Sequence, residues 1–211
     1  MTKVFYTQLT DLPINLEGLQ LSEYRRAKLA KQRIEAKKQQ GIAADLLLYH
    51  AVKSILPNYS GQLDIVVNEF GKPFFKNIAL DFSLSHSERH IVCVVSDSPV
   101  GIDVESKAKY RQDLSERFFC ADEISALRNS DNKDYDFARI WTAKESALKC
   151  IGTGIHRTLS SVNTTDASKI VLIPEGKTLQ SFHWFVNDAH CSVCIDSNKL
   201  IEQPLFIEME L

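Results

Sequence analysis

The sequence predicts an α+β protein whose two halves repeat the same order of elements. In the first half, a strand near residues 3–9 is followed by helices and then by several short strands. In the second half, a strand at 100–104 precedes helices at about 113–129 and 135–150, and four strand-like runs follow. The halves share no sequence identity, and no low-complexity linker separates them. We interpret the pattern as a structural duplication, with one lobe at 1–98 and a second at 99–211.

The composition is that of a globular, cytoplasmic protein. The chain has 211 residues, 44% of them hydrophobic, and a formal net charge of −2, so no global field attracts it to nucleic acid or to a membrane. No apolar run approaches the roughly 20 residues of a membrane span, and the N-terminus lacks an apolar signal segment. Five cysteines, an odd number, predict free thiols in a reducing cytosol. Cys191 and Cys194 stand in an apolar strand-like run, which favours buried thiols over a zinc site.

A basic run follows the first strand. Helical structure is predicted from Ser22, with Glu23 in the first turn, and a core helix follows Gly41 and ends at Pro57. The stretch from Arg25 to Lys38 contains one acid, Glu35, and seven basic residues: Arg25, Arg26, Lys28, Lys31, Arg33, Lys37 and Lys38. Such a run is either a solvated helix face or an anion-binding surface for phosphate or an acidic partner. Both interpretations stay open at this point.

The spacing of hydrophobic residues changes from a helical to a strand-like pattern after residue 62. Residues 63–67 form a strand, and 68–75 read as a turn between strands because Gly71-Lys72-Pro73 interrupts both helix and strand. A short strand at 81–84 leads to Ser85-His86-Ser87, where a turn histidine and a functional one are equally compatible with the sequence. Residues 90–96 form a continuous apolar strand, which we expect to be covered on both faces.

Two carboxylates alternate along the strand at 100–105. Val100, Ile102 and Val104 point one way, so the side chains of Asp103 and Glu105 share the opposite face. Like charges this close disfavour joint ionisation unless a cation compensates. The pair is either a solvent-exposed face or part of a site for a hard divalent cation such as magnesium, which prefers carboxylate oxygens.

The helix at 137–149 presents an acid and a base one turn apart. Trp141, Glu145 and Lys149 are spaced by four residues and therefore share one face. The simplest interpretation is an intrahelical Glu145–Lys149 salt bridge, which would contribute only about 0.2–0.5 kcal/mol. Gly152 to Gly154 supply a C-terminal cap and a loop.

These segments resemble the 4′-phosphopantetheinyl transferase superfamily. The resemblance rests on Gly101–Glu105 and Trp141–Lys149, and on two motifs upstream, Gly71–Pro73 and Leu84–Ser87, in the same order as in the family. Phe118-Phe119 with Glu123 is similar to a further motif. The length and the upstream motifs resemble the large two-lobed type that activates synthase carrier domains.

The resemblance implies a fold and a reaction. The fold is two similar α+β lobes, each a small, mostly antiparallel sheet packed with helices, with the active site between them. The enzyme would move phosphopantetheine from coenzyme A to a serine of an apo acyl, peptidyl or polyketide carrier, releasing 3′,5′-adenosine bisphosphate. We therefore expect coenzyme A and a carrier protein as partners, a magnesium-dependent monomer, and no nucleic acid or membrane.

The resemblance also assigns roles to residues. Asp103, Glu105 and Glu145 match the magnesium ligands, and Glu145 is also placed to take the serine proton. Lys149 matches the lysine that faces the pyrophosphate, and His86 matches the histidine that contacts the coenzyme A phosphates. The remaining matches to coenzyme-contacting positions are Lys72, Pro73, Ser85 and Lys144.

One departure concerns the 3′-phosphate of coenzyme A. Family members often carry an arginine just before the glycine of the second helix, where this chain has Gln39-Gln40 before Gly41. Lys37 or Lys38, or the group Arg25, Arg26 and Lys28, can substitute. The alternatives to this function are another magnesium-dependent transferase acting on a nucleotide pyrophosphate, a non-catalytic carrier-binding module, and a basic-helix binder of nucleic acid.

Overall fold

The computed structural model describes residues 1–10, 21–153, 158–166, 169–172, 176–198 and 200–210. The elements in chain order are β1 (Thr2–Gln8), α1 (Glu23–Lys31), α2 (Glu35–Ile55), β2 (Ile65–Val67), β3 (Pro73–Phe75), β4 (Asp81–Ser87), β5 (His90–Ser96), β6 (Val100–Ser106), α3 (Gln112–Phe118), α4 (Ala121–Arg128), α5 (Lys133–Ile151), η2 (Leu159–Ser161), β7 (Val162–Asn163), β8 (Lys169–Leu172), β9 (Lys177–Val186), β10 (Ala189–Ile195) and β11 (Leu205–Glu208). The α+β class predicted from the sequence is confirmed.

The strands form two larger sheets and one hairpin. The first sheet has the order β11-β1-β5-β4, and the second has the order β6-β10-β9-β8-β7. All pairs in both sheets are antiparallel except β1 with β11, which are parallel. The strand predicted at 204–208 therefore leaves the second half of the chain and completes the sheet of the first half. Strands β2 and β3 form the separate hairpin.

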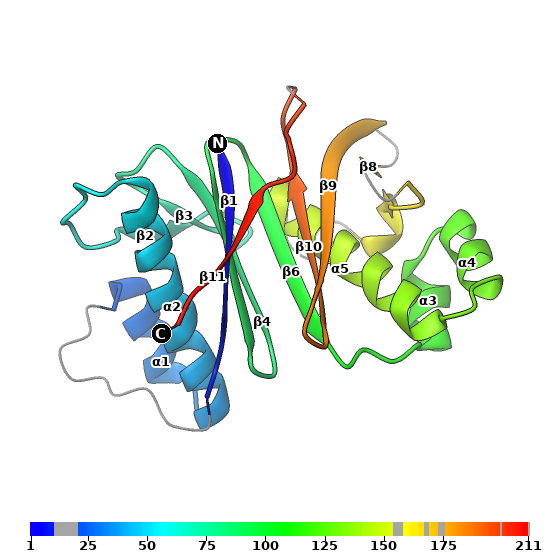
Figure 1. The fold of residues 1–211 in the computed structure, drawn as a ribbon, viewed down its shortest axis with the longest axis horizontal. Helices are drawn as coiled ribbons and strands as arrows, with labels where there is room; N and C mark the ends of the chain where they lie inside the picture. The colour runs from blue at the N-terminus through cyan, green and yellow to red at the C-terminus, as the bar shows by residue number, and fades with distance from the viewer. Residues whose placement is uncertain (11–20, 154–157, 167–168, 173–175, 199, 211) are drawn as a thin grey trace.

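The molecule is layered as helix, sheet, sheet and helix (Figure 1). Helix α2 packs on one face of the first sheet, through side chains such as Leu47 and Phe82. Helix α5 packs on the second sheet, through side chains such as Ala147 and Leu179. The remaining faces meet each other, with Val94 in one core cluster with Val193. This double covering explains why every residue of β5 is buried, as the apolar run predicted.

The two sheets are joined at β4 and β6 by side chains of β4. The Asp81 carboxylate accepts a hydrogen bond from the backbone N–H of Val100 (2.9 Å), and the Ser83 hydroxyl accepts one from Ile102 (3.2 Å). Further along, the Ser87 hydroxyl accepts one from the N–H of Ser106 (3.2 Å). The seam satisfies buried N–H groups of β6 that no neighbouring strand pairs with on this side.

The helix ends follow the predicted capping chemistry. The Ser22 hydroxyl accepts a hydrogen bond from the N–H of Arg25 and caps α1, and Gly152 ends α5 in the left-handed region, with φ of 70°. The basic run is divided between two helices, because the chain is extended at Gln32 and Ile34. Gly154 and Ile173, which belong to the predicted loop and strand, lie outside the described residues.

Two local predictions were wrong. Residues 73–75 were placed in a turn, but Pro73–Phe75 forms strand β3, because the proline begins the strand and its missing N–H is not required there. Residues 85–87 were placed after a short strand, but they continue β4, so His86 is a strand residue and is exposed.

The cysteines and helices agree with the remaining sequence predictions. All five cysteines are free, and Cys191 and Cys194 are buried on β10. Among the helices of the described residues, none is long and apolar enough to cross a membrane.

Candidate functional site

Strand β6 holds the carboxylate of Asp103 almost out of solvent. Its side chain accepts hydrogen bonds at Oδ1 from the Ser85 hydroxyl (2.8 Å) and from Lys149 Nζ (2.7 Å). The second oxygen, Oδ2, is also buried, and no described group donates to it. Asp103 is therefore not part of an exposed acidic face, and one of its oxygens remains available to a ligand.

Helix α5 lies very close to β6 because of Gly101. A Cβ atom at Gly101 would lie 2.0 Å from the carbonyl oxygen of Ser146 and 2.4 Å from the backbone nitrogen of Cys150. Only a residue without a side chain permits this approach. The close packing brings the exposed face of α5 over the carboxylates of β6.

Lys149 contacts strands of both sheets instead of closing an intrahelical pair. Its Nζ lies 2.7 Å from Asp103 Oδ1 on β6 and 2.9 Å from the Ser85 hydroxyl on β4. Glu145, one turn earlier, is half-buried and makes no hydrogen bond or ion pair with the described residues. The described residues therefore do not show an intrahelical Glu145–Lys149 salt bridge. Lys149 is paired with the buried carboxylate of Asp103 instead.

Burial, together with the charge of Asp103, raises the pKa of both glutamates near Lys149. Burial raises the pKa of Glu145, and the charges of Asp103 and Glu105 add to this effect, while Lys149 opposes it. Burial also raises the pKa of Glu105, again with a contribution from Asp103, although a hydrogen bond from Ser87 opposes it. A cation placed among these acids would relieve the repulsion.

The described residues do not form a complete metal-binding geometry. In the described part of the chain, no group of three or more His, Cys, Asp or Glu side chains is arranged to hold a metal ion. The donors nevertheless fit magnesium in kind, since Asp103, Glu105 and Glu145 offer carboxylate oxygens and Asp103 Oδ2 lacks a partner. Lys149 supplies the positive charge beside Asp103.

A cavity of about 560 Å³ opens over this cluster and is bounded by elements from both halves of the chain. The segment before β6 contributes Tyr24, Arg25, Lys28, Ala44, Phe70, Gly71, Lys72, Pro73, Phe82, Ser83, Leu84 and His86. The segment after β6 contributes Phe118, Glu145, Leu148, Lys149, Gly152, Thr158 and Leu159. The lining combines apolar side chains with several cations and the acid Glu145, which suits a charged small molecule.

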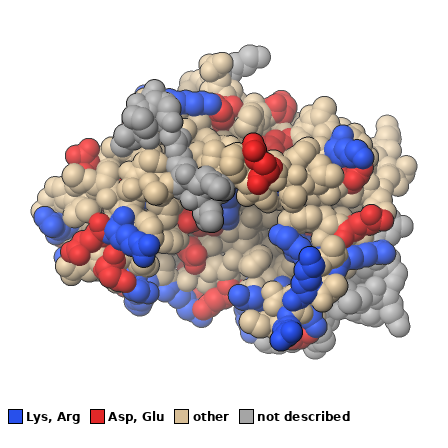
Figure 2. All heavy atoms as spheres, turned by 180° about the vertical axis from the view of Figure 1, so that it is seen from behind, with Lys and Arg blue, Asp and Glu red and all other residues tan. Residues whose placement is uncertain are grey.

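A second hollow of about 330 Å³ continues from the cavity and is markedly basic. It is lined by Arg25, Lys28, Leu29, Lys31, Gln32, Lys37 and His86, three of which also line the larger cavity. Figure 2 shows Lys and Arg side chains gathered at the side of the molecule where α1 lies. The basic run is therefore more than a solvated face, because part of it surrounds a concave surface.

Two groups in this hollow suit an anion. Although His86 is partly exposed, its desolvation in the hollow and the charges of Arg25, Lys149 and Lys37 lower its pKa, so an arriving anion would favour the charged imidazolium. Arg25 lies 3.8 Å from Asp45, but its buried Nε makes no hydrogen bond with a described group. The Asp45 carboxylate is bound by the backbone and hydroxyl of Ser22, which fixes α1 on α2.

The structure brings most of the predicted site residues together. Glu145, Lys149, His86, Lys72, Pro73, Arg25 and Lys28 line the cavity, and Ser85 and Asp103 lie at its Lys149 end. Arg26 is exposed on α1 and lines neither hollow. The ammonium of Lys72 donates to the backbone carbonyls of Val100 and Cys150.

Lys144 requires a correction. The sequence interpretation placed it among the coenzyme contacts, or as an exposed helix lysine, but its side chain is completely buried. Its Nζ lies 2.7 Å from Glu123 Oε2 and donates to the carbonyls of Leu159 and Val162. Lys144 therefore ties α4, α5 and the segment at 159–162 together and does not reach the cavity.

Sequence reasoning missed the side chains that join β4 to β6. Asp81, Ser83 and Ser87 face β6 from alternate positions of β4 and were not singled out. A signal existed, since polar residues alternate with other residues along 81–87 beside a fully apolar strand. That pattern indicates a buried polar face and not a solvent-exposed one when the neighbouring strands are covered.

Comparison with known proteins identifies relatives of this chain. Residues 99–194 match the family described as the 4′-phosphopantetheinyl transferase superfamily. The chain is similar to the 4′-phosphopantetheinyl transferase gsp of Aneurinibacillus migulanus (36% identical over 96 residues, covering 44% of this chain and 40% of that protein). It is also similar to a 4′-phosphopantetheinyl transferase of Bacillus subtilis (34% over 116 residues, covering 52% of each chain) and to psf-1 of Bacillus pumilus (29% over 169 residues, covering 75% and 72%). The chain thus spans about half the length of the first two of these relatives.

Proposed function

We propose that this chain, whose residues 99–194 match the 4′-phosphopantetheinyl transferase superfamily, transfers phosphopantetheine from coenzyme A to a serine of a carrier protein. The observation that carries the proposal is the cavity itself. Basic side chains gather at its α1 end, and Lys149 lies among three carboxylates at its other end. A ligand with several phosphates fits the basic end near α1. The transfer reaction fits the end that holds Lys149 and the carboxylates.

The basic hollow would hold the phosphates of the adenosine portion of coenzyme A. Lys28, Lys31 and Lys37 line it, and Arg25 has a buried Nε without a hydrogen-bond partner among the described residues. These side chains stand in for the arginine that the sequence lacks before Gly41. His86 lines both hollows and would contact the phosphates between them.

Asp103, Glu105 and Glu145 would hold magnesium. The support is the chemistry of the donors, the unsatisfied Oδ2 of Asp103 and the raised pKa of Glu105 and Glu145, which burial causes and the charge of Asp103 increases. When bound, magnesium would neutralise charge that develops on the pyrophosphate oxygens.

The residues of the chain would carry out the proton and charge steps. The serine oxygen bonds to the β-phosphorus, and the bond from that phosphorus to the bridging oxygen of the pyrophosphate breaks. Glu145 would accept the serine proton, directly or through a water molecule. Lys149 would present positive charge to the leaving phosphate, 3′,5′-adenosine bisphosphate.

The lobe division is part of the proposal. The lobe at 1–98 would supply most of the contacts to coenzyme A, and the lobe at 99–211 would supply the acids and Lys149, although β11 joins the first sheet. We place the reaction in the cytoplasm, because five free thiols suit a reducing compartment. We propose that the protein acts as a monomer, since each predicted site residue comes from this one chain.

A direct assay tests the proposal. Purified protein is incubated with coenzyme A, magnesium and apo-carriers of the acyl, peptidyl and polyketide types, and the products are weighed by mass spectrometry. We expect at least one carrier to gain the mass of phosphopantetheine, and we expect excess chelator or Asp103→Asn to abolish the gain. Cleavage of coenzyme A without carrier modification would instead indicate another transferase on a pyrophosphate. Unchanged transfer in chelator would overturn the magnesium assignment.

A further inference from the structure

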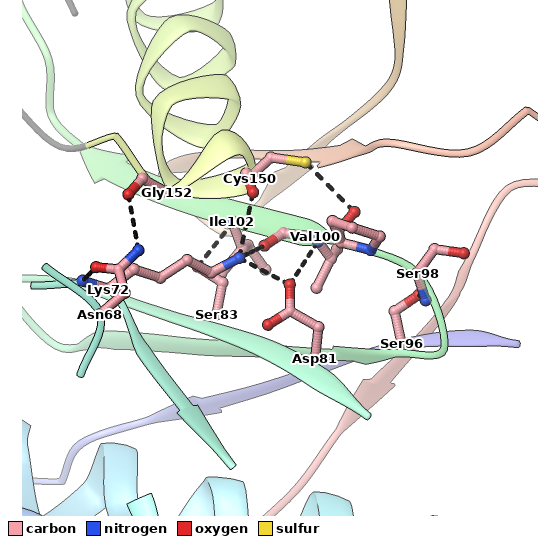
Figure 3. Close-up of polar contacts among 11 residues, drawn as sticks. Asn68, Lys72, Asp81, Ser83, Ser96, Ser98, Val100, Ile102, Cys150 and Gly152 are labelled. Carbon is pink, nitrogen blue, oxygen red and sulfur yellow. Dashed lines mark hydrogen bonds and ion pairs between the residues drawn. The ribbon is translucent and has the colours of Figure 1, made fainter. Parts of the chain in front are cut away.

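The ammonium of Lys72 has an acceptor within the protein for each of its three N–H groups (Figure 3). Its Nζ lies 2.7 Å from Asp81 Oδ2 and donates to the carbonyl oxygens of Val100 and Cys150, each at 3.2 Å. An ammonium has three N–H donors, so these three acceptors use all of them. They come from β4, from the start of β6 and from the last turn of α5, which belong to both lobes.

Asn68 adds a second contact from the same hairpin. Its side-chain nitrogen donates to the carbonyl of Gly152, at 3.0 Å, just after α5 ends. Its side-chain oxygen accepts from the N–H groups of Phe70 and Lys72, which shapes the β2–β3 turn. The side chain that shapes the turn is therefore also the one that fastens the turn to α5.

The end of α5 fits closely beneath these two side chains. A Cβ atom at Gly152 would lie 2.9 Å from Cδ of Lys72 and 3.3 Å from Nδ2 of Asn68. Asp81 completes the arrangement, because its Oδ2 accepts from both Lys72 Nζ and the N–H of Val100. The hairpin and β4 thus hold the start of β6 and the end of α5 together.

We propose that Lys72, with Asn68 and Asp81, is an interlobe clamp that positions the last turn of α5, and hence Lys149, over Ser85 and Asp103. Lys72 is then a positioning residue and not a cation for the coenzyme A phosphates, although its stem lines the cavity. Lys149 directly precedes Cys150, whose carbonyl accepts from Lys72. A shift of this turn therefore moves the Lys149 ammonium relative to β4. The catalytic consequence rests on the proposed function, but the clamp itself does not.

The test replaces Lys72 with methionine, which keeps an unbranched apolar stem and removes the ammonium. We expect the backbone amides of residues 149–152 to exchange hydrogen faster without any substrate. We also expect kcat to fall by about 10- to 100-fold, because a misplacement of about 1 Å can cost that much. The KM for coenzyme A and its salt dependence should stay within about threefold, since no phosphate contact is lost. The matched control is Lys76→Met, because Lys76 is an exposed lysine just after β3.

Two further variants keep the test decisive. Asn68→Ala removes the Gly152 contact while leaving Lys72, and it should also speed exchange at 149–152. Asp81→Asn combined with Lys72→Met should show non-additive losses of stability, because both changes break one contact.

The proposal fails if, in the Lys72→Met variant, the backbone amides of residues 149–152 exchange hydrogen at the wild-type rate and the KM for coenzyme A rises tenfold or more at unchanged kcat. That result would make Lys72 a phosphate ligand. If the wild type transfers nothing to any carrier but Lys72→Met still speeds exchange, the clamp stands and the proposed function falls.

Discussion

The ammonium of Lys149 lies 2.7 Å from Asp103 Oδ1, on a strand of the second sheet, and 2.9 Å from the hydroxyl of Ser85, on a strand of the first. A single side chain of α5 therefore contacts both sheets at the floor of the cavity. The two contacts fix the position of the Lys149 charge, on which the proposed reaction depends.

Lys149→Ala should lower kcat by about 10²–10³ at saturating coenzyme A and carrier, because one oriented charge near the leaving phosphate is lost. It should also destabilise the fold by more than the 0.2–0.5 kcal/mol of an exposed intrahelical pair, since buried Asp103 loses its cation. Steady-state kinetics and thermal unfolding measure the two effects. Lys133→Ala, on the exposed start of the same helix, serves as the control. A folded Lys149→Ala protein within about threefold of wild-type turnover would refute the catalytic role.

Glu145→Gln should change how stability depends on pH. The pKa of Glu145 is raised above its ordinary value of 4.5, so the folded chain holds this proton more tightly than the unfolded chain. Its contribution to the free energy of unfolding is therefore favourable at low pH and is lost as the pH rises from 4.5 through the folded pKa. Glu145→Gln should flatten that decline in metal-free urea unfolding between pH 4 and 8. Parallel curves for wild type and variant would contradict the electrostatic interpretation, and exposed Glu202→Gln controls for loss of a charge.

Lys28→Gln should raise the KM for coenzyme A and reduce its salt dependence, because Lys28 lines both hollows. Arg26→Gln removes an equal charge from the same helix at a position that lines neither, so its KM should stay close to that of wild type. Both variants are compared by steady-state kinetics at low and moderate salt. Equal changes in the two would mean that only the net charge of α1 matters.

Gly101→Ala should be severely destabilising. The added methyl group would meet the backbone of α5 at 2.0 Å, and backbone cannot rotate away as a flexible side chain can. We expect a loss at or above the upper end of the roughly 1–3 kcal/mol usual for overpacking, measured by urea unfolding. Gly61→Ala is the control, since its methyl group would meet only the side chain of Tyr59, at 3.2 Å. A stable Gly101→Ala protein would show that the close approach of α5 to β6 is not required.

Local patterns predicted the elements and the face of α5. Alternation placed Asp103 and Glu105 on one side of β6, and four-residue spacing placed Trp141, Glu145 and Lys149 on the accessible side of α5. These predictions succeeded because backbone geometry alone fixes the direction of neighbouring side chains.

Contacts between distant segments could not be predicted in the same way. The contact of Lys149 with Asp103 was not predicted because Asp103 is 46 residues away, and Lys144 was misplaced because Glu123 lies on another helix. Charge spacing within a helix does not reveal a buried partner from elsewhere in the chain. The basic run was predicted as a possible anion surface, but only the fold separates Lys28, which lines the hollows, from Arg26, which does not.

The pairing of β11 with β1 has a consequence for biosynthesis. The first sheet needs residues 205–208 to cover the outer edge of β1, and a ribosome delivers these residues only after it has made all of 9–204. Until β11 has been synthesised, one edge of β1 therefore has unpaired backbone N–H and C=O groups. Such an edge can pair with other chains and lead to aggregation. A fragment cut at residue 98 would keep that exposed edge permanently. A peptide containing the β11 sequence should then dock on the fragment in trans and suppress its aggregation.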